Sequence, residues 1–237
     1  MRVDIVIPTI NRAKKLDRCL KSIQKQKYKD YEVCVVINDL GREDTIEVIQ
    51  KYDFDKFWYK IPGNNLGVGG AWNYYFSNFF ERRNPDAVLW LVDDVEVLPD
   101  TIQKAVDCMV TNFPDTDGVV GLAQQCPGKM DYSFKWYGQV LLGNKFIRRY
   151  KDVNYQVCCP TYFHFHQDFE MYCFANKLNK FKECPQSILY HYHPCFLKEE
   201  LDSTHYLSRG TTKRVDDYKF KLRQEKNLIW GDSFEIL

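Results

Sequence analysis

Short apolar segments alternate with helical patterns through the first half of the chain. Five segments rich in apolar, β-branched and aromatic residues are typical of strands, namely 3–7, 31–37, 54–61, 87–92 and 118–123. Between them, apolar residues recur every three or four positions, as at Leu16, Leu20 and Ile23. This βαβα order predicts an α/β fold, with a mostly parallel central sheet and helices on both faces.

The regular alternation ends near residue 124. Residues 124–165 are rich in aromatics and glycine, and a helix at 167–179 and a strand at 187–193 are expected beyond them. No change of composition marks a linker, so we expect one domain, 1–237. Its first half, 1–123, has the pattern of a nucleotide-binding unit, and 124–237 would form an acceptor-binding half with a C-terminal tail.

Two adjacent carboxylates, Asp93 and Asp94, follow the apolar run 87–92. Ligands of open α/β sheets bind just beyond the carboxyl ends of such strands. Carboxylate oxygens suit hard divalent cations, and a cation there can hold the phosphates of a nucleotide. The pair therefore predicts a cation site, and a solvated turn after a strand is the alternative.

A glycine-rich loop at 62–70 precedes a helix with an aromatic stripe. It does not fit a dinucleotide fingerprint, because position 72 is Trp and the loop follows the third strand. It also lacks the Gly-Lys-Ser/Thr of a P-loop. The loop still places flexible backbone beside a helix N-terminus, which suits an anionic group.

Charge and cysteine content narrow the function classes. Lys and Arg number 33 against 32 Asp and Glu, and the formal net charge of +1 is too small to attract the chain to nucleic acid or membrane. Nine scattered Cys, without an apolar leader after Met1, predict free thiols in a reducing, cytoplasmic compartment. No apolar stretch approaches the ~20 residues of a membrane span.

Four motifs in sequence order carry a resemblance to a known family. They are Pro8-Thr9 with Asn11, Asn38-Asp39, the loop from Asn65 to Asn73, and the segment 92–100 with its adjacent acids. Together they resemble the inverting family-two glycosyltransferases, which have the GT-A fold. The resemblance extends from residue 3 to about 121. It implies transfer of a sugar from a nucleoside-diphosphate sugar to a hydroxyl of a glycan, lipid-linked or other acceptor.

The resemblance also implies roles for the donor side of the site. Asp39 would contact the nucleobase or ribose, although a plain turn acid is the alternative. Asp94 would bind Mn²⁺ or Mg²⁺ and the diphosphate. Val92 stands in the place of the first acid of the family's Asp-x-Asp, so Asp93 would contact the ribose or partly replace that acid. Further donor contacts are expected from Thr9, Asn65, Gly70 and Asn73.

The second half is expected to supply a general base. Inverting transfer needs a carboxylate that takes a proton from the acceptor hydroxyl. The family's base lies in an acidic pair that opens a helix, and Asp168 matches it, with Gln167 where a second acid is often found. Glu170 would orient the base or only favour the helix N-terminus, and Asp168 itself could be a simple helix-start charge.

Histidines and a basic run add weaker candidates. His191 follows an apolar strand, where family members often place a metal- or phosphate-facing His, and His193 shares its face. The cysteine spacings nearby argue against a closed zinc site. The basic run 212–226 is either a solvated helix face or a contact for an anionic acceptor or a lipid-phosphate surface.

Two other functions remain open from the sequence. A non-catalytic nucleotide-sugar-binding module is consistent with Val92, whereas Asp94 and Asp168 argue for an enzyme. The second is a sugar transferase that acts on modified nucleic acid, which would use the same sugar-transfer reaction with a different acceptor. The near-neutral charge argues against that partner, because phosphate neutralisation dominates nucleic-acid binding.

Overall fold

A nine-stranded sheet forms the centre of the computed structural model, which describes residues 1–38, 42–54, 56–127, 129–133, 138–193 and 208–236. The strands are β1 (Val3–Thr9), β2 (Tyr31–Ile37), β3 (Phe57–Lys60), β4 (Ala87–Trp90), β5 (Val95–Val97), β6 (Val119–Cys126), β7 (Lys129–Ser133), β8 (Val140–Gly143) and β9 (Phe181–His191). The helices are α1 (Ala13–Gln24), α2 (Glu43–Gln50), α3 (Gly67–Tyr75), α4 (Glu81–Arg83), α5 (Thr101–Asn112), α6 (Asn144–Ile147), α7 (Gln167–Lys177) and α10 (Lys213–Glu225).

The order of the strands explains the two halves of the sequence pattern. The sheet runs β3-β2-β1-β4-β8-β6-β9-β5, with β7 paired to β6. Strands β3, β2, β1 and β4 are parallel, which confirms the α/β fold expected from the first half. Strand β8 is antiparallel to both β4 and β6, so the second half is mixed. Antiparallel neighbours need no crossover helix, which is why the βα rhythm of the sequence stops there.

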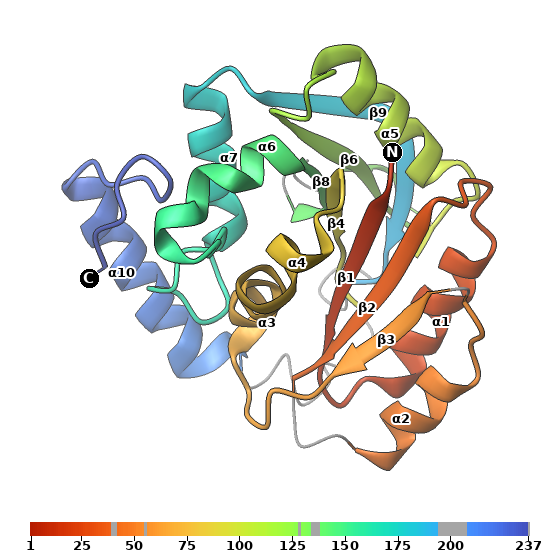
Figure 1. The fold of residues 1–237 in the computed structure, drawn as a ribbon. Coiled ribbons are helices and arrows are strands. Elements are labelled where there is room, and N and C mark those ends of the chain that lie inside the picture. The colour runs from red at the N-terminus through yellow and green to blue at the C-terminus, as the bar shows by residue number, and fades with distance from the viewer. Residues whose placement is uncertain (39–41, 55, 128, 134–137, 194–207, 237) are drawn as a thin grey trace.

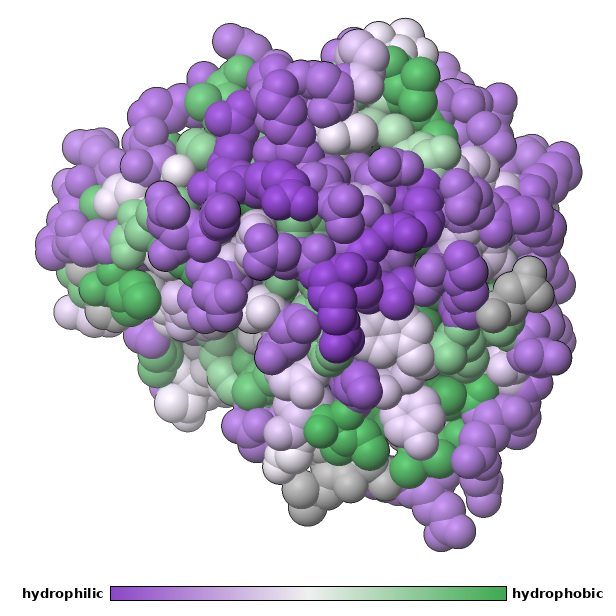
Figure 2. Space-filling model, viewed as in Figure 1, coloured by the Kyte–Doolittle hydropathy of each residue, from purple (hydrophilic) through white to green (hydrophobic). Residues whose placement is uncertain are grey.

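Helices cover both faces of the sheet (Figure 1), and the side chains packed between helices and sheet form two apolar cores. Val3, Ile5 and Ile7 of β1 face α1, α2 and α5, whereas Val6 faces α3 and the elements of the second half. All seven residues of β1 are buried, because alternate side chains enter opposite cores. This double burial produces the continuous apolar runs of the sequence. The outer face seen in Figure 2 is mainly hydrophilic, with small scattered apolar groups.

Several element boundaries differ from the sequence expectation. The aromatic stripe after the glycine-rich loop is not one helix, since α3 passes through a π-helical turn at Phe76–Phe80 before α4. Strand β3 is shorter than 54–61, and β4 ends at Trp90. The short strand β5 was not expected, and it begins directly after the two acids. The last strand, β9, starts six residues earlier than the expected 187.

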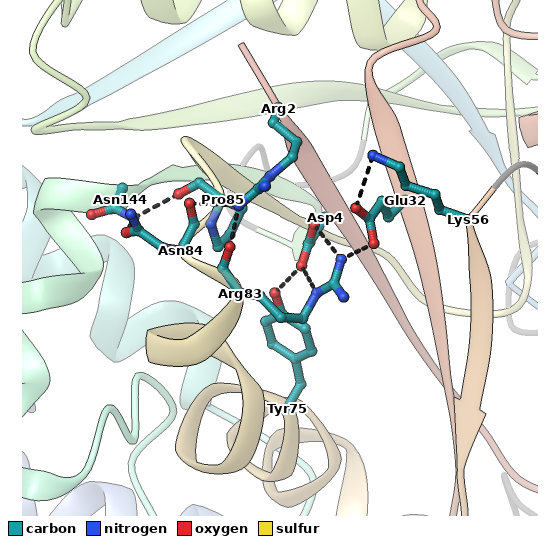
Figure 3. Close-up of polar contacts among 9 residues, drawn as sticks. All are labelled: Arg2, Asp4, Glu32, Lys56, Tyr75, Arg83, Asn84, Pro85 and Asn144. Carbon is teal, nitrogen blue, oxygen red and sulfur yellow. Dashed lines mark hydrogen bonds and ion pairs between the residues drawn. The ribbon is translucent and has the colours of Figure 1, made fainter.

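A buried ionic network ties the first strands to α4 at the amino end of β1 (Figure 3). Asp4, 1% exposed, accepts hydrogen bonds from the Tyr75 hydroxyl (2.5 Å) and from Arg83 Nε (2.6 Å). Arg83 also pairs with Glu32 of β2, which lies 3.4 Å from Lys56 Nζ. Burial and the neighbouring Asp4 raise the pKa of Tyr75. Arg83 is therefore the cation that allows Asp4 to be buried as a carboxylate.

The helices are short. Within the ranges that the structure describes, none is both long and apolar enough to cross a membrane. The eight cysteines in those ranges are all free thiols.

We expect Arg83→Met to lower the free energy of unfolding by about 3 kcal/mol, because it leaves Asp4 buried without its cation. The neighbouring Arg82 is exposed, so Arg82→Met should change stability by no more than about 0.5 kcal/mol. Urea unfolding of both variants measures this difference. Equal losses in the two variants would show that the network contributes no specific stability.

Candidate active site

The two acids predicted as a cation site lie between β4 and β5, and each is only 2% exposed. The Thr9 hydroxyl, at the end of β1, donates to Asp93 Oδ2 over 2.8 Å. Arg12 Nη1 lies 3.0 Å from Asp93 Oδ1 and 3.6 Å from Asp94 Oδ2. The parallel pairing of β1 with β4 brings these groups together, because both strands end at the same edge of the sheet.

Strand pairing also brings His191 to Asp94. Val95 of β5 pairs with His191 of β9, and the Tyr192 N–H donates to the Asp94 carbonyl oxygen over 2.8 Å. His191 Nε2 then lies 3.2 Å from Asp94 Oδ1, and Nδ1 lies 3.0 Å from Gln124 Oε1. An amide oxygen only accepts hydrogen bonds, so Nδ1–H donates to Gln124, and Nε2 faces Asp94.

The two acids have different electrostatic surroundings. Burial raises the pKa of Asp94, but the charge and hydrogen bond of His191 and the charge of Arg12 outweigh it and hold this pKa well below the usual range. Burial raises the pKa of Asp93, and the Asp94 charge adds to that effect against Arg12. Asp94 therefore loses its proton at a lower pH than Asp93 does. A carboxyl group must be ionised to bind a cation, so Asp94 is the better suited of the two.

The chemistry of Asp94 and His191 fits a divalent cation. Two ligands about 2.1 Å from one cation and at right angles to each other are about 3 Å apart, close to the 3.2 Å observed. Metal-ligating histidines usually donate their other N–H to an oxygen, as His191 does to Gln124. Among the described residues no cluster of three or more His, Cys, Asp or Glu could hold a metal. Two protein ligands would leave the other coordination positions of a cation for the phosphate oxygens of a bound nucleotide.

A cavity of about 900 Å³ opens at this edge of the sheet. Six residues expected in the site line it, namely Thr9, Asn65, Asp93, Asp94, Asp168 and His191. Asp93 and Asp94 come from the first half of the chain, and Asp168 comes from the second half. The cavity therefore places the candidate cation site and the candidate base in one space.

Other expected donor contacts lie elsewhere. Gly70 and Asn73 line a separate cavity of about 670 Å³, and neither is among the residues of the large one. The Asn73 side chain bonds both the N–H and the carbonyl oxygen of Cys158, so it fastens α3 to the second half. Asp39 lies outside the described residues.

The glycine-rich loop touches the second half directly. Gly67 has φ +73°, and a Cβ there would lie 1.8 Å from the Phe163 carbonyl oxygen. Only glycine fits this position. Asn65 Oδ1 accepts from the Gly67 N–H (2.9 Å) and from Asn38 Nδ2 (3.0 Å), which fixes the loop against the end of β2.

The helix that carries Asp168 is held by α10. Asp168 is in the first turn of α7, and its Oδ1 accepts from the Phe169 N–H over 2.9 Å. The loop before it is bound by Asp216 of α10, whose carboxylate accepts the N–H groups of residues 163, 164 and 165 at 3.1, 2.8 and 2.9 Å. The His166 ring stacks on Phe220 with centroids 4.2 Å apart. Three contiguous N–H groups on one buried carboxylate fix the path of this loop.

A buried ion pair joins the same two helices. Arg223, 0% exposed, donates to both oxygens of Glu170 at 2.7 and 3.1 Å. The Tyr162 hydroxyl (2.5 Å) and the Trp230 N–H (2.8 Å) complete the set of donors to Glu170. Glu170 does not line the large cavity, so its contacts are those of an anchor for α7.

Arg12, Gln124, Asp216 and Arg223 were not found by sequence reasoning. Each acts on a group about 50 to 80 positions away, and no local periodicity records such a contact. The sequence cue for Asp216 and Arg223 was the mixture of acids and bases in 212–226, which we interpreted as a solvated helix face or a contact for an anionic acceptor or a lipid-phosphate surface.

These features define a GT-A-type α/β protein with a carboxylate-rich cavity at the ends of its parallel strands. The model of the family described as glycosyl transferase family 2 matches residues 4–173. The chain belongs to this family.

The chain is also similar to a curated relative in sequence and to solved structures in fold. GalNAc(5)-diNAcBac-PP-undecaprenol beta-1,3-glucosyltransferase of Campylobacter jejuni is 33% identical over 100 residues, which are 41% of this chain and 31% of that protein. The structure of TarS from S. aureus is similar with a TM-score of 0.65, at 15% identity, over 99% of this chain and 45% of that one. The chain thus spans less than half of these proteins.

A second similar structure is the mannosyltransferase PcManGT of Pyrobaculum calidifontis, solved with GDP-Man and Mn²⁺. Its TM-score is 0.62 at 12% identity, over 98% of this chain and 77% of that one. At these identities the two structural likenesses concern the fold.

Removing Arg223 should destabilise the protein strongly. Arg223→Met leaves Glu170 as a buried charge without its cation, which costs about 3–5 kcal/mol. Lys221 lies on the same helix with a side chain 75% exposed, so Lys221→Met should change stability by less than about 0.5 kcal/mol. Chemical unfolding measures the stability of both variants. If Arg223→Met and Lys221→Met both had the free energy of unfolding of the wild type, the anchoring role of Arg223 would be contradicted.

Proposed function

We propose that this chain is an inverting glycosyltransferase that moves a sugar from a nucleoside-diphosphate sugar to an acceptor hydroxyl. One observation carries the proposal: a single cavity contains the Asp93–Asp94 pair with its cationic neighbours and the separate carboxylate Asp168. Transfer needs positive charge at the leaving diphosphate and a base at the acceptor. The membership of glycosyl transferase family 2 supports the same reaction class.

Asp94 and His191 would hold the divalent cation. Their oxygen and nitrogen donors favour Mn²⁺ over Mg²⁺, because an imidazole suits the later transition metals and Mg²⁺ prefers oxygen. When bound, the ion supplies Lewis-acid neutralisation of the diphosphate charge. Arg12 would add fixed positive charge at the same end of the cavity, where it already contacts both acids. A similar structure was solved with GDP-Man and Mn²⁺, which supports this choice.

Asp168 would act as the general base. Its carboxylate takes the proton of the acceptor hydroxyl while that oxygen forms a bond to the anomeric carbon. The bond from that carbon to the diphosphate oxygen breaks on the opposite side, and the electron pair leaves with the diphosphate. A single displacement of this kind inverts the anomeric configuration.

The residues that line the large cavity indicate which donor and acceptor molecules it would bind. Thr9 and Asn65 would contact the nucleotide, as would Asp39. Phe165, Phe169 and Phe220 line the cavity around Asp168 and offer apolar faces to an acceptor sugar. The Campylobacter relative is named for a PP-undecaprenol glycan, which supports a glycan or lipid-linked acceptor.

A non-catalytic nucleotide-sugar-binding module is the second candidate. Val92 favours it, because an apolar side chain lines the cavity where the family's first acid would stand. Asp168 in the same cavity favours the enzyme. A binding module would show nucleotide affinity without turnover.

Nucleoside diphosphate should bind at least about tenfold more tightly with Mn²⁺ than with a chelator, and Asp94→Asn should abolish that difference. Asp100→Asn is the matched control, because Asp100 is half-exposed and pairs with Lys27. Calorimetric titration measures the affinities. Equal wild-type affinity with metal and with chelator would eliminate the metal role.

Asp168→Asn keeps the shape of the side chain and removes the proton acceptor. The variant should bind the nucleotide sugar normally and transfer it about 10²–10⁴ times more slowly. Asp152 is exposed and does not line the cavity, so Asp152→Asn should keep the wild-type rate. NMR of the wild-type product should show an inverted anomeric centre. A retained configuration, or near-normal turnover of Asp168→Asn, would refute the assigned mechanism.

A further inference from the structure

A cavity of about 720 Å³ between α5 and β9 is lined by two cysteines, Cys108 and Cys184. These two elements supply its lining, and they lie side by side in Figure 1. Neither cysteine lines the large cavity of the proposed sugar transfer. Cys108 is half-buried, and Cys184 is 3% exposed. A small molecule that enters the cavity between α5 and β9 would therefore meet both cysteines.

A bulge in β9 surrounds the Cys184 sulfur with backbone donors. The register of β9 against β6 shifts directly after Cys184, so residues 185–187 are extra on the β9 side. The N–H groups of Gln186 and Ser187 in this bulge donate to the Cys184 sulfur. Hydrogen bonds to a charged group favour its charged form, so both stabilise a thiolate. The protonated thiol donates to the Lys104 carbonyl oxygen over 3.5 Å, but an S–H group is a weak donor.

The two cysteines share a hydrogen bond, in which the Cys108 thiol donates to the Cys184 sulfur. This hydrogen bond lowers the pKa of Cys184 to about 7, against the opposing effect of burial. The same hydrogen bond, together with burial, raises the pKa of Cys108. The neighbouring charges have smaller effects, since Lys182 lowers the pKa of Cys108 and Asp107 raises the pKa of Cys184. At neutral pH a thiolate on Cys184 therefore lies beside a thiol on Cys108.

We propose that Cys108 and Cys184 form a peroxide-reactive dithiol, which hydrogen peroxide converts to a disulfide between α5 and β9. The Cys184 thiolate attacks one peroxide oxygen, the O–O bond breaks, and Cys184 becomes a sulfenic acid. The departing hydroxide takes up the proton that Cys184 had released. The Cys108 sulfur then attacks the Cys184 sulfur, and its proton leaves with the hydroxyl group as water. Two thiols are thus oxidised to one disulfide, and one hydrogen peroxide is reduced to two waters.

The arrangement of the two side chains supports this assignment. Redox-sensing cysteines combine a stabilised thiolate with a second thiol that resolves the sulfenic acid. Two sulfurs that share a hydrogen bond need to approach by only about 2 Å to form a disulfide. Cys108 lies in α5 and Cys184 in β9, so regular elements hold both in place. The disulfide would fasten α5 to the strand that ends at His191, and its formation does not depend on the proposed sugar transfer.

The test treats the reduced protein with hydrogen peroxide at pH 7 and maps the products by mass spectrometry of its peptides. Cys108→Ser keeps a hydrogen-bond donor beside Cys184 but cannot form the disulfide, so dimedone should trap Cys184 as a sulfenic acid. Cys184→Ser should leave Cys108 as a thiol. The matched control is Cys173→Ser, since Cys173 is a half-buried thiol of α7 that does not line the cavity between α5 and β9. Thermal unfolding verifies that the variants are folded, and the wild-type peptide map tests the disulfide without any substitution.

We expect the wild type and Cys173→Ser to yield a peptide pair linked through Cys108 and Cys184, and dithiothreitol to restore both thiols. In Cys108→Ser, dimedone should label Cys184 at least about tenfold faster than Cys173. The reason is that about half of a thiol with a pKa near 7 is ionised at pH 7, whereas burial raises the pKa of Cys173 and leaves it almost wholly protonated.

Three results would overturn the dithiol. Peroxide could oxidise the wild type without producing a peptide pair linked through Cys108 and Cys184. Either cysteine could form equal amounts of disulfide with other cysteines, which would show that the two are not a preformed pair. Dimedone could label Cys184 and Cys173 of Cys108→Ser at the same rate, which would show that Cys184 has no stabilised thiolate.

Discussion

The burial of two adjacent carboxylates at the end of β4 is the constraint on which the site depends. Asp93 and Asp94 are each 2% exposed, and neighbouring like charges out of water are costly unless cations and donors surround them. Thr9 and Arg12 from the end of β1 supply part of that compensation. His191 supplies the rest through the pairing of β5 with β9. The ends of β1, β4, β5 and β9 thus meet where the buried charge of Asp93 and Asp94 must be compensated.

The ion pair between Asp94 and His191 also leaves both side chains able to bind a cation instead of each other. His191 Nε2 and Asp94 Oδ1 face each other, and in the proposed function a divalent cation takes the place of the proton between them. At the other side of the cavity, Asp216 and Arg223 of α10 hold the loop and helix that carry Asp168. The proposed reaction therefore uses two rigid walls, one built by the sheet and one by α10. A base on such a wall is held in place before the substrate arrives.

The sequence predicted the parts of the fold that local pattern determines. Strands β1, β2 and β4 are buried on both faces, so their apolar runs were plain, and the acids after β4 lie at the edge of the sheet where the large cavity opens. The antiparallel entry of β8 and the pairing of β5 with β9 depend on contacts distant in sequence, which periodicity does not record. For this reason Arg12, Gln124 and Asp216 were missed. Gly70 and Asn73 were expected at the donor but lie at the other cavity, because a motif gives the spacing of residues and not the side of the helix that faces the ligand.

The central claim is that Asp94 and His191 bind a cation beside the diphosphate, in the cavity that contains Asp168. The most direct measurement is a crystal structure of the protein with a nucleoside diphosphate and Mn²⁺, with the metal located by its anomalous scattering. The account predicts one Mn²⁺ within about 2.3 Å of Asp94 Oδ1 and His191 Nε2, and also bound to phosphate oxygens. A nucleotide bound in this cavity with Asp94 and His191 still paired to each other, and Mn²⁺ absent or elsewhere, would contradict it.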